Sequence, residues 1–326
     1  MNVESLLLLL LLLIIDLSKY NCYTIEFAQN YFKETLVIIL FNFNPHIDVI
    51  INHYNIWKYL YPNQLIVGHF DSIKQKSIIV ELRKHLSNNT HNLHIASAMH
   101  YDAEPGFLNY KALYYAINQL KNYNGYLFLH DDMAINMTKF LSLNLNRNKI
   151  WQETWTGTFG KTPMNVSFTK ETWGNKGHGM NYPWFDTKWG IEAFNKMLEK
   201  NEDIKSRLKE CNLNNADAYD LFVCESDFVY FPSSVIEELK YFTKIFSEYG
   251  IFLEMALPTI IECFLSDIDE VHYLPLCTFW DNRYNYALYQ KECITNEVLY
   301  HPLKLTQPGA LKFMKKLAEL ENSNYD

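Results

Sequence analysis

Long clusters of lysine and arginine are missing from this sequence. Its 29 basic residues are outnumbered by 37 acidic ones, and the formal net charge is -8. Proteins that bind nucleic acids rely on clustered Lys and Arg to contact the phosphate backbone, so this composition argues against a nucleic acid as partner. A small anionic ligand is still compatible with the charge if a metal ion mediates its binding.

The cysteine patterns that bind zinc are also absent. Six cysteines occur, without a CxxC pair or a ladder of Cys and His. Structural zinc sites use such closely spaced ligands, so one or two disulfides are a better interpretation than zinc. Spacing does not determine which cysteines pair. Cys22 lies near the N-terminus, and the other five gather in the C-terminal half: Cys211, Cys224, Cys263, Cys277 and Cys293.

The apolar run from Leu6 to Ile15 is too short to cross a bilayer, which needs about 20 apolar residues. Its length is typical of the apolar core of a signal peptide, so we expect residues 1–20 to be a signal peptide or a signal anchor in the membrane. Before the run stands Glu4, where signal peptides usually carry a basic residue. After the run, no pair of small residues at the spacing of a cleavage site follows. The segment is therefore either cleaved or retained as an anchor. In either case we expect the protein to work in the lumen of the secretory pathway, in the Golgi or ER, or to be secreted if the segment is cleaved. Three N-glycosylation sequons agree, at Asn88, Asn136 and Asn165.

Apolar patterns alternate between strand and helix from residue 34 to 140. Four short apolar runs predict buried strands, and the stretches between them repeat apolar residues every three or four positions, as helices do. This alternation predicts an α/β fold with a mostly parallel central sheet and helices on both faces. No repeat or linker interrupts residues 34–326, which favours one elaborated domain. The predicted strands are 36–41, 65–67, 93–98 and 125–129, and the predicted helices 47–60, 78–86 and 107–120.

The second half of the chain is less regular. Helices are predicted at 192–208, 233–249 and 252–264, a strand at 227–231 and a final helix after residue 299. The stretch 151–190 is predicted to lack regular structure. Indole rings pack on sugar rings, so its tryptophans are candidates for an acceptor site. Such residues are more often part of the core, and we expect at least half of them to be buried for packing alone. They are Trp151, Trp155, Trp173, Trp184 and Trp189.

Two adjacent carboxylates, Asp131 and Asp132, follow the fourth predicted strand directly. Ligands of parallel α/β sheets bind beyond the carboxyl ends of the strands. Magnesium and manganese are commonly held by one or two carboxylates, with substrate phosphates as further ligands. The pair therefore predicts a cation site that neutralises a diphosphate and stabilises it as a leaving group. The alternative is a simple loop cap, a common role of Asp.

The segment Gly125–Asp132, GYLFLHDD, together with the three βα units before it, resembles the nucleotide-sugar half of GT-A glycosyltransferases, with some likeness to exostosin-type members. The likeness implies a GT-A, Rossmann-like fold, with a nucleotide-sugar half at 34–140 and an acceptor half at 141–326. In this superfamily the last aspartate of an Asp-x-Asp turn contacts Mn²⁺ or Mg²⁺, which implies Asp132. His130 replaces the first acid and is a further candidate metal ligand. His130 or Asp131 is left to meet the ribose or a metal-bound water.

The resemblance also implies a late histidine that returns to the metal. His301 matches it, and Lys304 is then available to the diphosphate as a point charge; an ordinary surface loop is the alternative. Sugar transfer further needs a carboxylate facing the anomeric carbon. Glu254 is the first candidate, because a charge among apolar neighbours is costly to bury without a task or a salt bridge. Asp227 and Glu225 are the alternates.

Four residues are candidates for binding the nucleotide. Phe41 and Asn42, after the first predicted strand, offer stacking and amide hydrogen bonds. Asn109 and Lys111 lie near the start of the helix before the acidic pair. Asparagines in loops are also common turn residues, and aromatic residues beside strands are commonly core.

These features together predict a lumenal glycosyltransferase that uses Mn²⁺ or Mg²⁺. It would move a sugar from a nucleoside diphosphate, by analogy UDP, to a glycan, protein or lipid acceptor. Two alternatives stay open. A metal-dependent phosphohydrolase also uses paired acids, but usually needs more His and Asp ligands. A non-catalytic lumenal scaffold or lectin-like protein would keep the fold without the activity, and His130 in the place of an acid favours this reading.

Overall fold

The computed structural model describes residues 23–41, 46–68, 70, 72–85, 92–97, 110–155, 164–168, 191–211, 219–223, 226–265, 271–278, 297–303, 305, 307 and 309–320. The predicted signal segment, residues 1–20, lies outside this set. Within the described ranges, the apolar helices are too short for a bilayer span.

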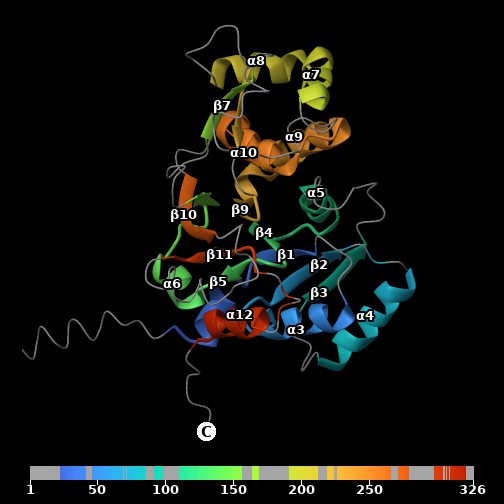
Figure 1. Ribbon diagram of the computed structural model, residues 1–326, viewed down its shortest axis with the longest axis vertical. Helices are drawn as coiled ribbons and strands as arrows, with labels where there is room; N and C mark the ends of the chain where they lie inside the picture. Colours follow the sequence, from blue (N-terminus) through green and yellow to red (C-terminus); the bar gives the residue numbers. More distant parts are fainter. Residues whose placement is uncertain are drawn as a thin grey trace, which may run out of the picture.

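A mixed sheet of nine strands runs through the centre of the molecule, in the order β3-β2-β1-β4-β9-β6-β10-β11-β5 (Figure 1). Strand β9 is antiparallel to β4 and β6, and β5 is antiparallel to β11, whereas the other neighbours are parallel. The prediction of a mostly parallel sheet is therefore confirmed. The strands are β1 Thr35–Phe41, β2 Asn63–Gly68, β3 Asn92–Ser97, β4 Gly125–His130, β5 Ala134–Ile135, β6 Ile150–Trp155, β9 Phe228–Pro232, β10 Val271–Thr278 and β11 Leu299–His301.

Strand β1 shows why the central strands are continuous apolar runs. Val37, Ile39 and Phe41 belong to one buried cluster. Leu36, Ile38 and Leu40 belong to a second cluster on the opposite face. A strand buried on both faces needs apolar side chains at every position, because successive side chains point to opposite sides.

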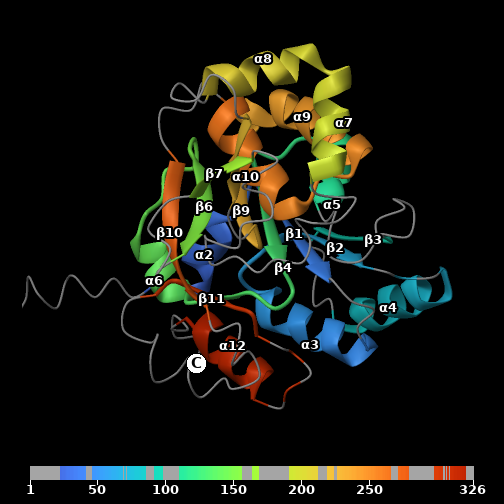
Figure 2. The ribbon, with the colours of Figure 1, turned by 45° about the horizontal axis from the view of Figure 1, so that its top comes forward.

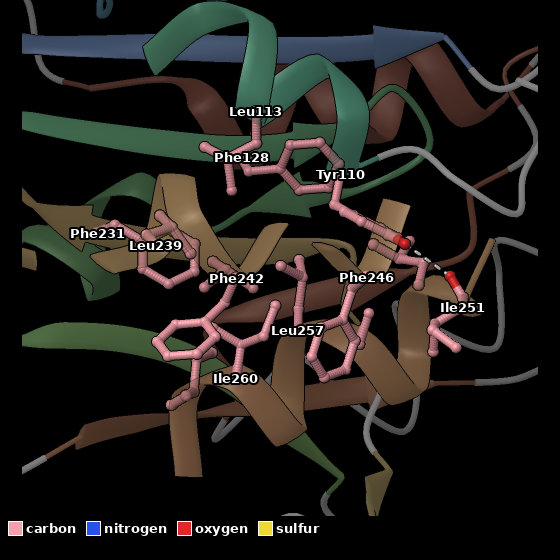
Figure 3. Close-up of a cluster of buried hydrophobic side chains, with 14 of the residues drawn as sticks. Tyr110, Leu113, Phe128, Phe231, Leu239, Phe242, Phe246, Ile251, Leu257 and Ile260 are labelled. Carbon is pink, nitrogen blue, oxygen red and sulfur yellow. Dashed lines mark hydrogen bonds between the residues drawn. The ribbon is translucent and has the colours of Figure 1, made fainter. Parts of the chain in front are cut away.

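Helices cover both faces, as predicted. One face is packed by α5 (Tyr110–Gln119), α9 (Ile236–Tyr249) and α10 (Leu253–Phe264). There the sheet residues Phe128 and Phe231 meet Leu113, Phe242 and Leu257 (Figure 3). The hydroxyl of Tyr110 donates to the carbonyl of Ile251 at 2.8 Å, which ties the start of α5 to the turn before α10.

The other face is covered by α2 (Ile25–Tyr31), α3 (Ile47–Trp57), α4 (Ser72–His85), α6 (Met137–Ser142) and α12 (Ala310–Ala318). Helix α12, near the C-terminus, packs beside α3 (Figure 2). Helix α12 therefore supports the first βα units, and the two halves share one core. This agrees with a single elaborated domain.

A disulfide fastens the outer helices to this core. Cys211 at the end of α8 (Glu202–Cys211) is bonded to Cys263 in α10, with Cα atoms 5.3 Å apart. Cys277 in β10 is also disulfide-bonded, and its partner lies outside the described residues. One predicted helix, 192–208, is in fact two: α7 (Ile191–Lys200) and α8. Asn201 lies between them. Its side-chain amide donates to the backbone carbonyl of Met197 at 2.8 Å, and local hydrogen bonds of this kind compete with continuation of the helix.

The prediction that 151–190 lacks regular structure is wrong for its first part. Residues 150–155 form the internal strand β6, and 164–168 form β7, which pairs with β8 (Tyr219–Val223) in a separate small sheet. Trp151 is fully buried and stacks on Tyr230 with ring centroids 3.9 Å apart, so it is core and not an acceptor contact. The side chain of Trp155 and the other three tryptophans of this stretch lie outside the described residues.

Candidate functional site

The direction of β9 brings distant residues to one edge of the sheet. Strands β4, β6, β10 and β11 run the same way, and β9 runs opposite between β4 and β6. The amino end of β9 therefore lies at the same edge as the carboxyl ends of β4 and β11. His130 ends β4, Asp227 precedes β9 and His301 ends β11. This is the edge at which parallel α/β sheets bind ligands.

Four buried side chains meet there: His130, Asp132, Asp227 and His301, which we call the His–Asp cluster. The Nδ1 atom of His130 donates to Oδ1 of Asp227. Nδ1 of His301 lies 3.3 Å from the other oxygen of Asp227, Oδ2, and Nε2 of His301 lies 3.2 Å from Oδ1 of Asp132. Carboxylates and imidazoles thus alternate along one chain of contacts.

The charge state of Asp227 follows from these neighbours. Burial alone would raise the pKa of its carboxyl, because the charged form loses solvation. The charges of His301 and His130, together with the His130 hydrogen bond, outweigh burial and the nearby Asp132, and the pKa lies below its ordinary value. Asp227 is therefore ionised at neutral pH and acts only as an acceptor.

Backbone hydrogen bonds fix the cluster in place. The amide of Asp227 donates to Oε1 of Glu153, a fully buried carboxylate in β6, and the amide of His130 donates to the carbonyl of Asp227 at 2.9 Å. The amide of Leu303 donates to the carbonyl of Asp132 at 2.7 Å. The backbone at His130, Asp132 and Asp227 is therefore held by residues that are distant in the sequence.

Two buried residues beside this site, Glu153 and His53, were not predicted from the sequence. Glu153 was assigned to an irregular stretch, and only its place in β6 shows that it supports Asp227. His53 lies on the buried face of α3 between Phe41 and Trp57, with ring centroids 5.4 and 6.2 Å away. His53 could have been found from its position, because it is a titratable residue on the apolar stripe formed by Ile50, Tyr54 and Trp57.

We predict that His53 makes the protein sensitive to acid. Burial lowers its pKa from 6.5 to about 3, against weaker opposing effects from the Asp131 backbone and the Asp132 charge. The unfolded chain therefore binds a proton that the folded chain excludes, and stability falls as pH drops below 6.5 towards 3. Between pH 7.5 and 5.0 this histidine should cost about 2 kcal/mol of unfolding free energy.

Urea unfolding at the two pH values measures this effect. His53→Phe keeps a ring between Phe41 and Trp57 and should reduce the loss by that amount. His46→Gln, at an exposed position, is the matched control and should leave the loss unchanged. An equal pH dependence in wild type and His53→Phe would contradict the assignment.

The donor set at Asp132 and His301 fits a hard divalent cation with two protein ligands. Neighbouring ligands at about 2.0–2.2 Å from one octahedral ion are about 3 Å apart, close to the 3.2 Å between Asp132 Oδ1 and His301 Nε2. Metal-binding histidines usually direct their other ring nitrogen at a carboxylate, as His301 does towards Asp227. The part of the chain that is described contains no group of three or more ligands arranged for a metal. Substrate, water and residues outside the described ranges are the remaining sources of ligands.

The other predicted site residues have different outcomes. Phe41 is a correction: its ring is only 1% exposed and packs on His53 in the core, so it cannot stack on a nucleotide base. Asp131 is partly exposed at the cluster, and its amide donates to the carbonyl of Leu40 at 2.9 Å. Lys111 lies half-buried in the first turn of α5, and Glu254 lies buried in the first turn of α10. Asn42, Asn109, Glu225 and Lys304 lie outside the described residues.

Comparisons by sequence find no matching family model and no matching curated protein. Comparison of structures finds glycosyltransferases. The mannosyltransferase Ktr4p from S. cerevisiae is 9% identical with a TM-score of 0.38, over 74% of this chain and 68% of that chain. The glucosyl-3-phosphoglycerate synthase from Mycobacterium tuberculosis, in complex with Mn²⁺, UDP-glucose and phosphoglyceric acid, is 9% identical with a TM-score of 0.35, over 78% and 74%.

These solved structures belong to the class that the sequence resemblance names, and the exostosin-type likeness stays a prediction. At such identities and TM-scores the likeness describes the course of the chain and carries no information about substrate or activity. The chain is thus similar in its course to a mannosyltransferase and to a glucosyl-3-phosphoglycerate synthase.

Proposed function

We propose that this protein is a metal-dependent glycosyltransferase that moves a sugar from a nucleoside diphosphate, UDP in the first instance, to a glycan, protein or lipid acceptor. One observation carries the proposal: Asp132 and His301 meet at the ligand-binding edge of the sheet, although 169 positions separate them in the chain. Their spacing suits a shared cation, and a cation lets a protein of net charge -8 accept a diphosphate.

The proposal gives a role to each residue at the ligand-binding edge of the sheet. Asp132 and His301 would hold Mn²⁺ or Mg²⁺, and the bound ion would neutralise the diphosphate as it leaves. Asp131, partly exposed beside them, is placed to accept a hydrogen bond from a ribose hydroxyl or a metal-bound water. Asn42, Asn109, Lys111 and Lys304 stay candidates for the nucleotide and the diphosphate.

Glu254 stays the candidate for the carboxylate that assists transfer. It lies on the sheet face covered by α5, α9 and α10, where burial among apolar residues needs a compensating interaction or a task. Glu225 is the alternate. Asp227, the other alternate, is engaged by two imidazoles and suits a supporting role better than proton transfer with substrate.

We further propose that the protein works in the secretory pathway, Golgi or ER, with residues 1–20 as signal peptide or membrane anchor. The disulfide Cys211–Cys263 and the bonded Cys277 support this location, because the cytosol keeps most thiols reduced. Fractionation of cells that express the full chain, with protease protection of the lumenal part, tests the proposal. Protease-sensitive protein in the cytosolic fraction would contradict it.

Thermal unfolding with Mn²⁺, with UDP and with both tests the catalytic proposal. A ligand that binds only the folded state stabilises it, by about 2.7 kcal/mol at one hundred times its Kd. We expect little effect from UDP alone and a larger effect of the pair than the sum of the two. GDP and UMP serve as comparison ligands for the base and the diphosphate. No joint stabilisation by any diphosphate would favour the non-catalytic scaffold, and hydrolysis of p-nitrophenyl phosphate would favour the phosphohydrolase.

A further inference from the structure

Charge is divided unevenly between the helices on the two sides of the sheet. We call α2, α3, α4, α6 and α12 the basic helix layer, because together they carry eight Lys or Arg and three Asp or Glu. The helices on the opposite side, α5, α7, α8, α9 and α10, carry eight basic and ten acidic residues. A protein of net charge -8 therefore has one positive side.

The basic residues of the two sides also differ in their partners. On the opposite side, four lysines each form an ion pair with a glutamate of the same helix: Lys196, Lys205, Lys240 and Lys244. In the basic helix layer, Lys84 is paired with Glu81. Five other exposed cations of this layer form no ion pair with any described residue, and their charge is available to a partner: Lys76, Arg83, Lys312, Lys315 and Lys316.

Exposed apolar side chains gather on the same side. Of the six large apolar residues that are exposed in the described ranges, five lie in the helices of the basic layer or directly after them: Phe27, Tyr59, Ile73, Val80 and Leu143. A single exposed apolar residue is ordinary, but several of them beside unpaired cations indicate a surface that binds a partner.

Helix α4 shows the two kinds of residue on one stripe. Ile73, Lys76, Val80 and Arg83 follow one another at steps of three and four residues, which places them on one side of the helix. Ile73 is 77% exposed and Val80 is 54% exposed. Apolar and basic side chains on one exposed face are typical of helices that lie in the interface of a membrane.

A groove of about 940 Å³ lies between α2, α3 and α12, next to α4 in the same layer (Figures 1 and 2). Two lysines, Lys312 and Lys315, and one acid, Glu319, are among its lining residues. The groove thus combines apolar walls with two ammonium groups, and a phospholipid combines an acyl chain with a phosphate. Its apolar lining residues are Ile25, Ile56, Leu60, Leu311, Ala318 and Leu320.

The position of the predicted signal or anchor segment agrees with this partner. The apolar run ends at Ile15, and Ile25 both begins α2 and lines the groove. The nine residues between them span at most about 30 Å when fully extended. A run retained in a membrane would therefore keep the basic helix layer close to the lipid surface.

We propose that the basic helix layer is a membrane-docking surface that binds anionic phospholipid, with α4 and α12 against the head groups. The inference concerns the folded domain and goes beyond a terminal anchor. It needs neither the cation site nor sugar transfer, so it can fail or hold independently of the proposed enzymatic function.

Lysine acetylation followed by mass spectrometry tests the proposal on the full chain, because it reads the lysines of both sides in one experiment. The chain is mixed with vesicles of phosphatidylcholine, or of phosphatidylcholine with about one third phosphatidylserine. We expect phosphatidylserine to protect Lys76, Lys312, Lys315 and Lys316, and to leave Lys196, Lys240 and Lys244 reactive. Phosphatidylcholine also takes up the apolar run, so it separates insertion of residues 1–20 from docking of the layer.

A triple variant measures the contribution of α12: Lys312→Gln, Lys315→Gln and Lys316→Gln. Each basic residue near an anionic surface strengthens binding roughly fivefold, so the lipid concentration that half protects Lys76 should rise about 100-fold. The matched control removes the same charge from the opposite side and should leave that concentration unchanged: Lys196→Gln, Lys240→Gln and Lys244→Gln. All six side chains are on the surface of helices, and thermal unfolding verifies that both variants are folded.

The apolar part of the surface is tested by Ile73→Ser with Val80→Ser, which keeps every charge and should weaken docking about tenfold. Equal protection by the two kinds of vesicle, or an equal loss in the α12 variant and its control, would overturn the proposal. Protection without vesicles that rises with protein concentration would overturn it too, since a second copy of the chain would then cover this face.

Discussion

Changing Asp132 to asparagine is expected to abolish the joint stabilisation by Mn²⁺ and UDP. The substitution keeps the size of the side chain and removes the negative charge that faces His301 Nε2 at 3.2 Å. A hard cation loses its only carboxylate within this pair, so the apparent affinity for Mn²⁺ with UDP should fall by more than the roughly 100-fold seen when an orienting residue is lost. Calorimetric titration of Mn²⁺ in the presence of UDP measures the change.

Asp48→Asn is the matched control. Asp48 is an exposed acid in the first turn of α3, where the same substitution should leave Mn²⁺ and UDP binding intact. If Asp132→Asn binds the pair as tightly as wild type does, the cation is not held at this edge, and the enzymatic proposal loses its main support.

Removing the disulfide between α8 and α10 is expected to cost about 4 kcal/mol of unfolding free energy. The bond joins residues 52 positions apart, and a loop of that length restricts the unfolded chain by this amount in the chain-entropy model. Because both sulfurs lie between packed helices, serine at Cys211 and Cys263 should otherwise disturb little. Urea unfolding of the double variant measures the loss.

Substitution is a better test than reduction, because a reducing agent also cleaves the bond at Cys277. The double serine variant should unfold at a lower urea midpoint and keep Mn²⁺ and UDP binding at low urea, since the disulfide lies outside the His–Asp cluster. Wild-type stability in this variant would show that helix packing alone holds α8 in place.

The first βα units could be predicted from the sequence because each has a single local pattern. Strands β1 and β4 are largely continuous apolar runs, β2 and β3 contain shorter ones, and apolar residues recur at helical spacing between them, so local periodicity and burial agree. Strands β6 and β10 could not be found in this way. Gln152 and Glu153 are fully buried in β6 but polar, and a polar residue inside a sheet looks like a loop residue until its neighbours are known.

The candidate site was predictable in its parts and not in its connections. Asp132 and His301 were expected to meet, from a resemblance and not from spacing, and the structure brings them to 3.2 Å. The bridge through Asp227 depends on the reversed direction of β9, which only the pairing of strands reveals. Phe41 was misassigned because an aromatic residue at a strand end has the same local sequence whether it faces a ligand or the core.

The reversed strand has a consequence for how the protein matures. Residues 132, 227 and 301 come together only when β9 and β11, from later parts of the chain, are in the same sheet as β4. A nascent chain that has emerged only as far as β9 has both aspartates but lacks His301. The site that we propose for nucleotide and cation would therefore be complete only after the whole chain has folded.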